Sequence, residues 1–181
     1  MDNRLYNQAA TPENVWAIIQ EFAKETDRRI EENDRRMKEL QKTVGGIANN
    51  QGAFAEEYFS NSFERGEKNF FGESFDDVKK NLKNFRKGIT DEFDIVMYNH
   101  AAVAIIEVKY KADPKDLNQV LKKAKTFRIF WPKYKDFKIY LGLASLCFNT
   151  ELEKKCIEEG IAVIKQVGDK VVINDEHLKV F

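Results

Sequence analysis

Two consecutive apolar runs, EFDIVMY (residues 92–98) and AVAIIEVKY (residues 102–110), constrain the fold of this 181-residue chain more than any other feature. Their β-branched and aromatic residues predict two strands, which a short turn would join as a hairpin. A third apolar run, FKIYLGLASL (residues 137–146), predicts another buried strand. A fold of the α/β class, with these strands in its central sheet, is therefore expected.

Further segments complete the α/β pattern. We predict helices over residues 49–65, 114–130 and 150–159, a last hairpin formed by residues 161–166 and 170–173, and a short strand with a loop over residues 71–83. The first of these helices is expected to turn Ala53, Phe54 and Tyr58 toward the core, with Phe63 as a further candidate. The resulting element order is α, β, β, β, α, β, α, β, β.

Residues 11–44 predict a helix of a different kind. Ten positions from Trp16 onward advance by alternating steps of three and four residues, and eight of the ten are apolar. These seam positions are Trp16, Ile19, Ala23, Thr26, Ile30, Asn33, Met37, Leu40, Val44 and Ile47. The period of 3.5 residues is that of a coiled-coil seam, whereas a helix packed along its own domain needs a wider apolar stripe.

Gly45 and Gly46 follow this helix, and we expect them to break or loosen it and to act as a hinge. The chain is thus predicted to comprise an N-terminal helical coiled-coil segment, residues 1–46, and an α/β domain, residues 47–181. The coiled-coil segment would form a homodimer.

Composition narrows the possible partners and compartments. Thirty basic and thirty acidic side chains cancel, so the overall charge selects neither nucleic acid nor membrane. No apolar stretch has the length of a membrane-spanning helix, and we expect no membrane partner. Cys147 and Cys156 lack the spacing of metal ligands, which predicts reduced thiols and a cytoplasmic protein.

Charged side chains interrupt both strands of the first hairpin. Glu107 and Lys109 lie two residues apart and project from one face of their strand, while Val108 points to the other face. If the turn has four residues, Asp94 lies directly opposite Glu107, and if it has two, Glu107 is its diagonal neighbour. Both registers gather Asp94, Glu107 and Lys109 on one face, whereas a three-residue turn would separate Asp94 from the other two.

Two carboxylates opposed across a strand pair repel each other, and half-burial adds to the cost. A divalent cation, Mg²⁺ or Mn²⁺, would offset that cost because it takes oxygen ligands. We expect Asp94, Glu107 and the main-chain carbonyl of Val108 to be its ligands. Lys109 would then orient or deprotonate a water and neutralise the charge that develops on a phosphate.

Asp94, twelve intervening residues, and then Glu107-Val108-Lys109 at the end of an apolar strand resemble the PD-(D/E)xK nuclease superfamily. This superfamily includes restriction endonucleases and Holliday junction resolvases. The resemblance extends over roughly residues 47–181, although no Pro precedes Asp94. It implies a restriction-endonuclease-like αβββαβ core with a central mixed sheet, which the predicted element order matches, and metal-dependent cleavage of DNA.

The same resemblance implies two further site residues. Members of the superfamily usually carry a Glu on the first core helix, and Glu56 in GAFAEEYF matches it, with Glu57 as its rival. The helix after the third strand often carries a Gln that faces the site, and Gln119 in DLNQVLKKAK fits that place. The implied catalytic set is Glu56, Asp94, Glu107, Lys109 and Gln119.

The local distribution of charge favours a nucleic-acid partner. Residues 77–138 contain 15 Lys and Arg against 8 Asp and Glu, and basic runs flank the proposed site. We therefore expect a nuclease that hydrolyses DNA phosphodiester bonds with a metal-activated water. The alternative is a catalytically inactive nuclease-like coiled-coil protein that serves as a nucleic-acid-binding or protein-interaction module. The complete set of charged site residues favours the nuclease.

Overall fold

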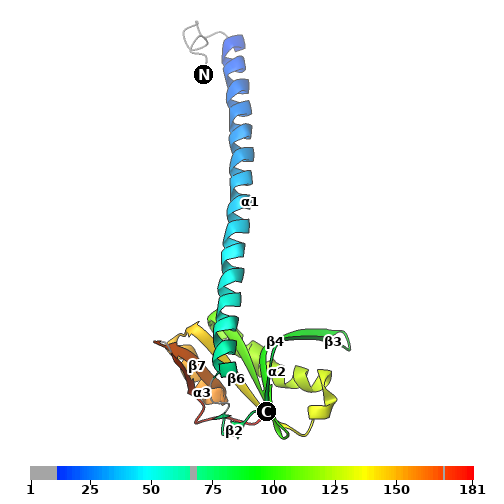
Figure 1. Ribbon diagram of the computed structural model, residues 1–181. Coiled ribbons are helices and arrows are strands. Elements are labelled where there is room, and N and C mark those ends of the chain that lie inside the picture. The colour runs from blue at the N-terminus through cyan, green and yellow to red at the C-terminus, as the bar shows by residue number, and fades with distance from the viewer. Residues whose placement is uncertain (1–11, 66–68, 169) are drawn as a thin grey trace. The chain divides into compact units, whose positions relative to one another are not determined.

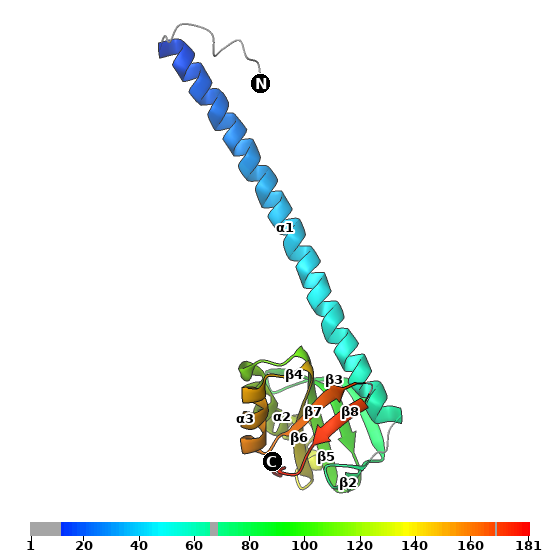
Figure 2. The same ribbon diagram turned by 90° about the vertical axis from the view of Figure 1, so that its left-hand side faces the viewer.

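The computed structural model describes residues 12–65, 69–168 and 170–181. A long N-terminal helix precedes a mixed six-stranded sheet with further helices (Figures 1 and 2). The elements are α1 (Pro12–Arg65), β1 (Asn69–Phe70), β2 (Glu73–Ser74), β3 (Asp77–Arg86), β4 (Ile89–Tyr98), β5 (Ala102–Lys111), α2 (Pro114–Phe130), η2 (Pro132–Tyr134), β6 (Lys138–Cys147), α3 (Thr150–Glu159), β7 (Ala162–Val167) and β8 (Lys170–Asn174). The chain divides into two compact units, with the boundary between Ala48 and Asn49.

Helix α1 is continuous across Gly45 and Gly46. The predicted break at these two glycines is therefore wrong, since a helix tolerates an interior Gly at a cost of about 1 kcal/mol relative to Ala. Residues 1–11 of the predicted coiled-coil segment lie outside the described residues.

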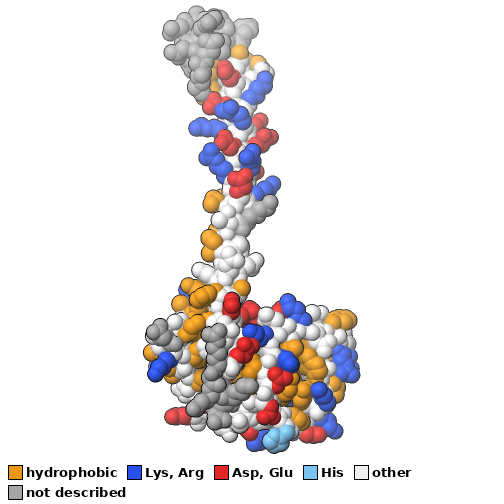
Figure 3. All heavy atoms as spheres, viewed as in Figure 1, with side chains coloured by type: hydrophobic (Ala, Val, Ile, Leu, Met, Phe, Trp, Pro, Cys, Tyr) orange, Lys and Arg blue, Asp and Glu red, His pale blue; other side chains and the backbone are white. Residues whose placement is uncertain are grey.

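The described part of the first unit exposes its apolar seam. Trp16, Ile30, Leu40 and Val44 are between 54% and 62% exposed. Basic and acidic side chains alternate along the same helix (Figure 3), and some pair at i,i+4 spacing, as Arg36 does with Glu32. A helix with a charged surface and an uncovered apolar line is typical of one strand of a coiled coil.

The sheet of the second unit has the order β3-β4-β5-β6-β7-β8. Pairing is parallel for β5–β6 and β6–β7 and antiparallel elsewhere. The succession α1, β3, β4, β5, α2, β6 reproduces the αβββαβ order, which confirms the predicted α/β fold class. β3 is a full edge strand of ten residues, where we predicted a short strand and a loop.

Helices cover both faces of this sheet. α2 and α3 pack on one face, and the last turns of α1 pack on the other. The face of α1 toward the core consists of Ala55, Phe59 and Phe63, spaced four residues apart. Ala53 is exposed and Phe54 is 58% exposed, so the predicted orientation of these two residues is wrong.

Strands β3 and β4 bend together at Asn81 and Asp94. Asn81 has a φ of 50°, in the left-handed region, and both residues lie between regular cross-strand pairs. Val78 packs toward α1, yet Leu82, four residues later, packs toward α2. In a regular strand, residues four apart lie on the same face of the sheet. The bend therefore turns the side chains that follow it toward the opposite face from the one that regular alternation gives.

No helix in the described ranges is long and apolar enough to cross a membrane. Both cysteines are free: Cys147 is exposed, and Cys156, on α3, is buried. Burial, followed by the charge of Glu153, raises the pKa of Cys156 to about 11.

Candidate active site

The candidate site lies where β4 separates from β5. Pairing between these strands ends at Ile95 and Ile106, and Asp94 and Glu107 are the next residues along each strand. This register is the one expected for a four-residue turn. Beyond it, β4 remains paired with β3 while β5 continues beside β6. The two strands diverge at the two carboxylates.

Asp94 is held against the backbone of β5. Its Oδ2 accepts a hydrogen bond of 2.7 Å from the Val108 N–H, and only 9% of the residue is exposed. Burial and then the charge of Glu107 raise the pKa of Asp94 to about 7, against the lowering effects of the Val108 N–H and of Lys109. A positive charge placed beside Asp94 would therefore favour its ionised form.

Glu107 lies between two lysine ammonium groups. Lys109 Nζ donates a hydrogen bond of 2.7 Å to Oε1, and Lys123 Nζ lies 3.1 Å from Oε2. The contact of Oε2 with Lys123 is an ion pair between two buried groups. Glu107 is 6% exposed, and a carboxylate buried to this extent requires such partners.

Lys109 is an ammonium in this arrangement. Burial lowers its pKa, but the hydrogen bond and the charge of Glu107 outweigh burial, and the pKa of Lys109 is raised overall. A raised pKa suits the stabilisation of negative charge and opposes proton abstraction from water. In the metal-free protein, Lys109 is therefore poorly suited to deprotonate a water.

Lys123 is a site residue that sequence reasoning missed. It projects from α2, and its ammonium contacts Glu107, Asp91 Oδ1 at 2.9 Å and the carbonyl oxygen of Glu92. The signal that could have found it is its position four residues after Gln119, which places both on one face of the helix.

Glu56 lies nearer the site than Glu57 does. Glu56 is half-buried on α1, whereas Glu57 is exposed. Burial is the first cause of the raised pKa of Glu56, and the charges of Glu92 and Glu107 add to it, while Lys109 lowers it. These interactions place the Glu56 carboxyl within electrostatic range of the β5 residues.

Gln119 borders the site at the surface. Its exposed side chain lines a depression of about 380 Å³ between α2 and the strands. The lining residues are Thr90, Asp91, Glu107, Gln119, Lys122, Lys123 and Thr126. Gln119 and Glu107 therefore line the same depression.

The donor set at the strand divergence fits a hard divalent cation. Among the described residues, no group of three or more His, Cys, Asp or Glu side chains is arranged to hold a metal. Mg²⁺ needs fewer, because it commonly takes one or two carboxylates and fills its other positions with water and substrate oxygens. Asp94 and Glu107 supply two carboxylates side by side, with the Val108 carbonyl as a candidate third donor.

Comparison with known proteins gives a partial likeness of fold. No protein-family model and no curated protein matches the chain. Among solved structures, Can2 from Sulfobacillus thermosulfidooxidans, in complex with cyclic tetra-adenylate, is 19% identical with a TM-score of 0.45, over 62% of this chain and 31% of that chain. A repair endonuclease from Pyrococcus abyssi is 18% identical with a TM-score of 0.44, over 61% of this chain and 46% of that chain. This chain spans less than half the length of either protein.

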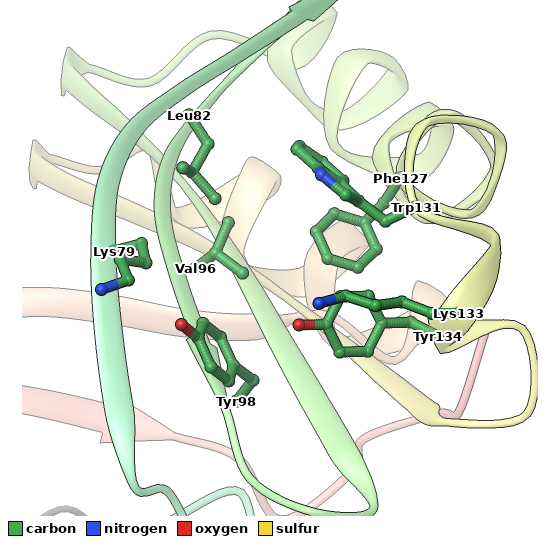
Figure 4. Close-up of a pocket in the computed structure, with 8 residues that line it drawn as sticks. All are labelled: Lys79, Leu82, Val96, Tyr98, Phe127, Trp131, Lys133 and Tyr134. Carbon is green, nitrogen blue, oxygen red and sulfur yellow. The ribbon is translucent and has the colours of Figure 1, made fainter.

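A second concave region lies farther along α2 (Figure 4). This aromatic slot, of about 180 Å³, separates side chains of β3 and β4 from side chains of α2 and η2. It is lined by Lys79, Leu82, Val96, Tyr98, Phe127, Trp131, Lys133 and Tyr134. The lining contains no carboxylate.

Proposed function

We propose that this protein is a cytoplasmic, Mg²⁺- or Mn²⁺-dependent nuclease that hydrolyses phosphodiester bonds of DNA. The observation that carries the proposal is the meeting of Asp94, Glu107 and Lys109 at the divergence of β4 and β5, with Glu56 close by. Two opposed buried carboxylates are costly, which indicates a role other than stability. The cytoplasm is suggested by two free thiols.

The cation would be held by Asp94, Glu107 and the carbonyl of Val108. When bound, it lowers the pKa of a coordinated water and polarises a phosphate oxygen. Burial first, and the charge of Glu107 second, raise the pKa of Asp94 to about 7, so its ionised form lacks a sufficient compensating positive charge in the metal-free protein. The protein itself therefore supplies a place where positive charge is stabilised.

The chain's own side chains perform the remaining tasks. The Lys109 ammonium neutralises negative charge as it develops on the phosphoryl oxygens. Glu56, whose pKa is raised by burial, is suited to exchange a proton with the attacking water. Gln119 reaches the same depression and can donate hydrogen bonds to the substrate phosphate.

Contacts with DNA would extend from this depression. Lys122 lines it, and Lys125 is exposed on the same helix. Such side chains bind phosphates with release of counterions. The aromatic slot (Figure 4) offers Trp131 and Tyr134 as surfaces for a base that leaves the duplex.

The proposed nuclease is a homodimer through α1. The exposed seam from Trp16 to Ile47 needs a partner helix, and a second copy presents the same seam. In a parallel pair, Asn33 would meet its mate and fix the register, and Arg29 would face Asp34. A dimer would carry two nuclease domains, an arrangement suited to cutting both strands of a duplex.

A plasmid-cleavage assay tests the enzymatic proposal. The purified protein should nick or linearise plasmid DNA with Mg²⁺ or Mn²⁺, and EDTA should stop it. Glu107→Gln, which keeps the shape of the side chain, should abolish cleavage, while Glu159→Gln, at an exposed position of α3, should not. Equal cleavage by wild type and Glu107→Gln would refute the assigned site. An inactive wild type that still binds DNA would favour the binding-module alternative.

A further inference from the structure

Three oxygen atoms surround the Lys123 ammonium. Its neighbours are Asp91 Oδ1 at 2.9 Å, Glu107 Oε2 at 3.1 Å and the Glu92 carbonyl oxygen. The side chain is 9% exposed, so the charge is removed from bulk solvent. Two carboxylates and a main-chain carbonyl are the ligand types that a divalent cation takes in proteins.

Glu107 divides its two oxygens between different cations. Oε1 faces Lys109, and Oε2 faces Lys123 on the α2 side. A carboxylate used in this way resembles the bridging ligand of sites that hold two metal ions about 3.5–4 Å apart. In this chain both oxygens face lysine side chains, and Lys123, at 9% exposed, is the more deeply buried of the two, against 29% for Lys109.

We propose that the Lys123 ammonium is a built-in cation that fills a potential second divalent-cation site, so that the centre takes a single metal ion. The role of this arrangement in cleavage rests on the proposed nuclease function, whereas the occupied cation site rests on the contacts of Lys123 alone.

The surroundings of Lys123 keep it charged and in place. The ion pairs with Asp91 and Glu107 favour the charged ammonium over the neutral amine. The ammonium also lies 5.2 Å from the centroid of the Phe93 ring, a favourable cation–π contact. Its backbone position is fixed because Val120, Ala124 and Phe127 anchor α2 in the core.

A charge fixed in this way would confer two properties. It neutralises part of the negative charge on Glu107 whether or not a metal is bound, and it prevents a second ion from competing for that carboxylate. A purely structural ion pair would confer only stability. The two interpretations predict different numbers of bound metal ions when Lys123 is replaced.

The experiment counts Mn²⁺ ions by isothermal titration calorimetry and by electron paramagnetic resonance on the full chain. Wild type should bind one Mn²⁺ per chain. Lys123→Ala should bind one more than wild type, because it uncovers the oxygens of Asp91, Glu92 and Glu107. Lys123→Arg, which restores a cation, and Lys122→Ala, which removes an exposed neighbour, should show no gain.

The gain of one ion in Lys123→Ala supports the inference, and an unchanged stoichiometry overturns it. Two ions bound by wild type would also overturn it, which keeps the test decisive if Lys123→Ala does not fold. If wild type binds no ion, the proposed metal-dependent function fails, yet a gain of one ion in Lys123→Ala would still support the occupied cation site. Circular dichroism and thermal melting monitor folding, and Mn²⁺ should raise the Tm of Lys123→Ala by more than that of Lys122→Ala.

Discussion

Asp94→Asn should stabilise the metal-free protein at neutral and alkaline pH. The amide keeps the shape of the side chain and an oxygen that accepts the Val108 N–H hydrogen bond. It removes the charge that burial and Glu107 oppose. The proposed metal-binding role of Asp94 and the stability of the fold would therefore make opposite demands at this position.

The magnitude follows from the pKa of Asp94. It is raised from 3.8 to about 7 in the folded protein, a difference of about 3 pKa units at 1.36 kcal/mol each, or about 4 kcal/mol at most. Because Glu107 contributes to the pKa shift, part of this energy belongs to both carboxylates. We therefore expect Asp94→Asn to raise the free energy of unfolding by about 2–4 kcal/mol. For a chain of this size, each 1 kcal/mol corresponds to about 2–4 °C in Tm.

The sign depends on pH. Because the folded-state pKa is raised, the protonated Asp94 is favoured by folding, and this contribution is fully present below about pH 4. It is lost as pH rises toward about 7, where Asp94 ionises in the folded protein as well. Glu107 and Lys109 on β5 and Glu56 on α1 face the same carboxyl and shape the curve. The advantage of Asp94→Asn should grow between about pH 4 and pH 7 and then level off.

Urea denaturation in EDTA, at several values between pH 4 and pH 8.5, measures this difference in the free energy of unfolding. Asp136→Asn, at an exposed position, serves as the control, and its free energy of unfolding should follow that of wild type across the pH range. A difference between wild type and Asp94→Asn that stays constant with pH would refute the reasoning. With saturating Mn²⁺, the order should reverse, because only wild type keeps the full ligand set.

Three further predictions concern catalysis, the fold and assembly. Lys109→Met should lower cleavage by about 10²–10³ while Mn²⁺ binding, followed by calorimetry, persists; unchanged cleavage would assign the activity elsewhere. Gly160→Ala should destabilise the fold by about 1–2 kcal/mol or more in urea titrations, because Gly160 has a φ of 75° and an added Cβ would collide with the Lys179 side chain. The full chain should be a dimer in light scattering and a truncated chain that begins at Ile47 a monomer; a monomeric full chain at tens of micromolar would contradict the coiled coil.

Elements with strong local signals could be predicted from the sequence. α2 begins at Pro114 and ends at Phe130, because proline is compatible with a first helical turn and apolar side chains recur at helical spacing. α3 ends before Gly160, whose left-handed conformation caps it. A four-residue turn sets the register of the hairpin, and this register places Asp94 opposite Glu107.

Other features depend on contacts that no local pattern carries. β3 lies at the edge of the sheet and exposes several lysines, so its sequence lacks the apolar alternation that reveals a strand. Ala55, Phe59 and Phe63, spaced four residues apart, form the face of α1 toward the core. Phe54 is equally apolar, so the sequence alone did not reveal which of these side chains is buried. Lys123 meets Asp91 only because β4 diverges from β5, which is a property of the assembled sheet.

The bend at Asn81 and Asp94 has a consequence for how this domain can vary in length. Beyond the bend, β3 and β4 pair with each other as far as a tight turn at Lys87 and Gly88, both with positive φ. Residues inserted or deleted there in cross-strand pairs would preserve the alternation of faces and leave Asp94 where it is. The part of the β3–β4 hairpin beyond the bend is therefore the segment in which changes of length can alter the surface beside Asp94 and Glu107 without moving these two carboxylates.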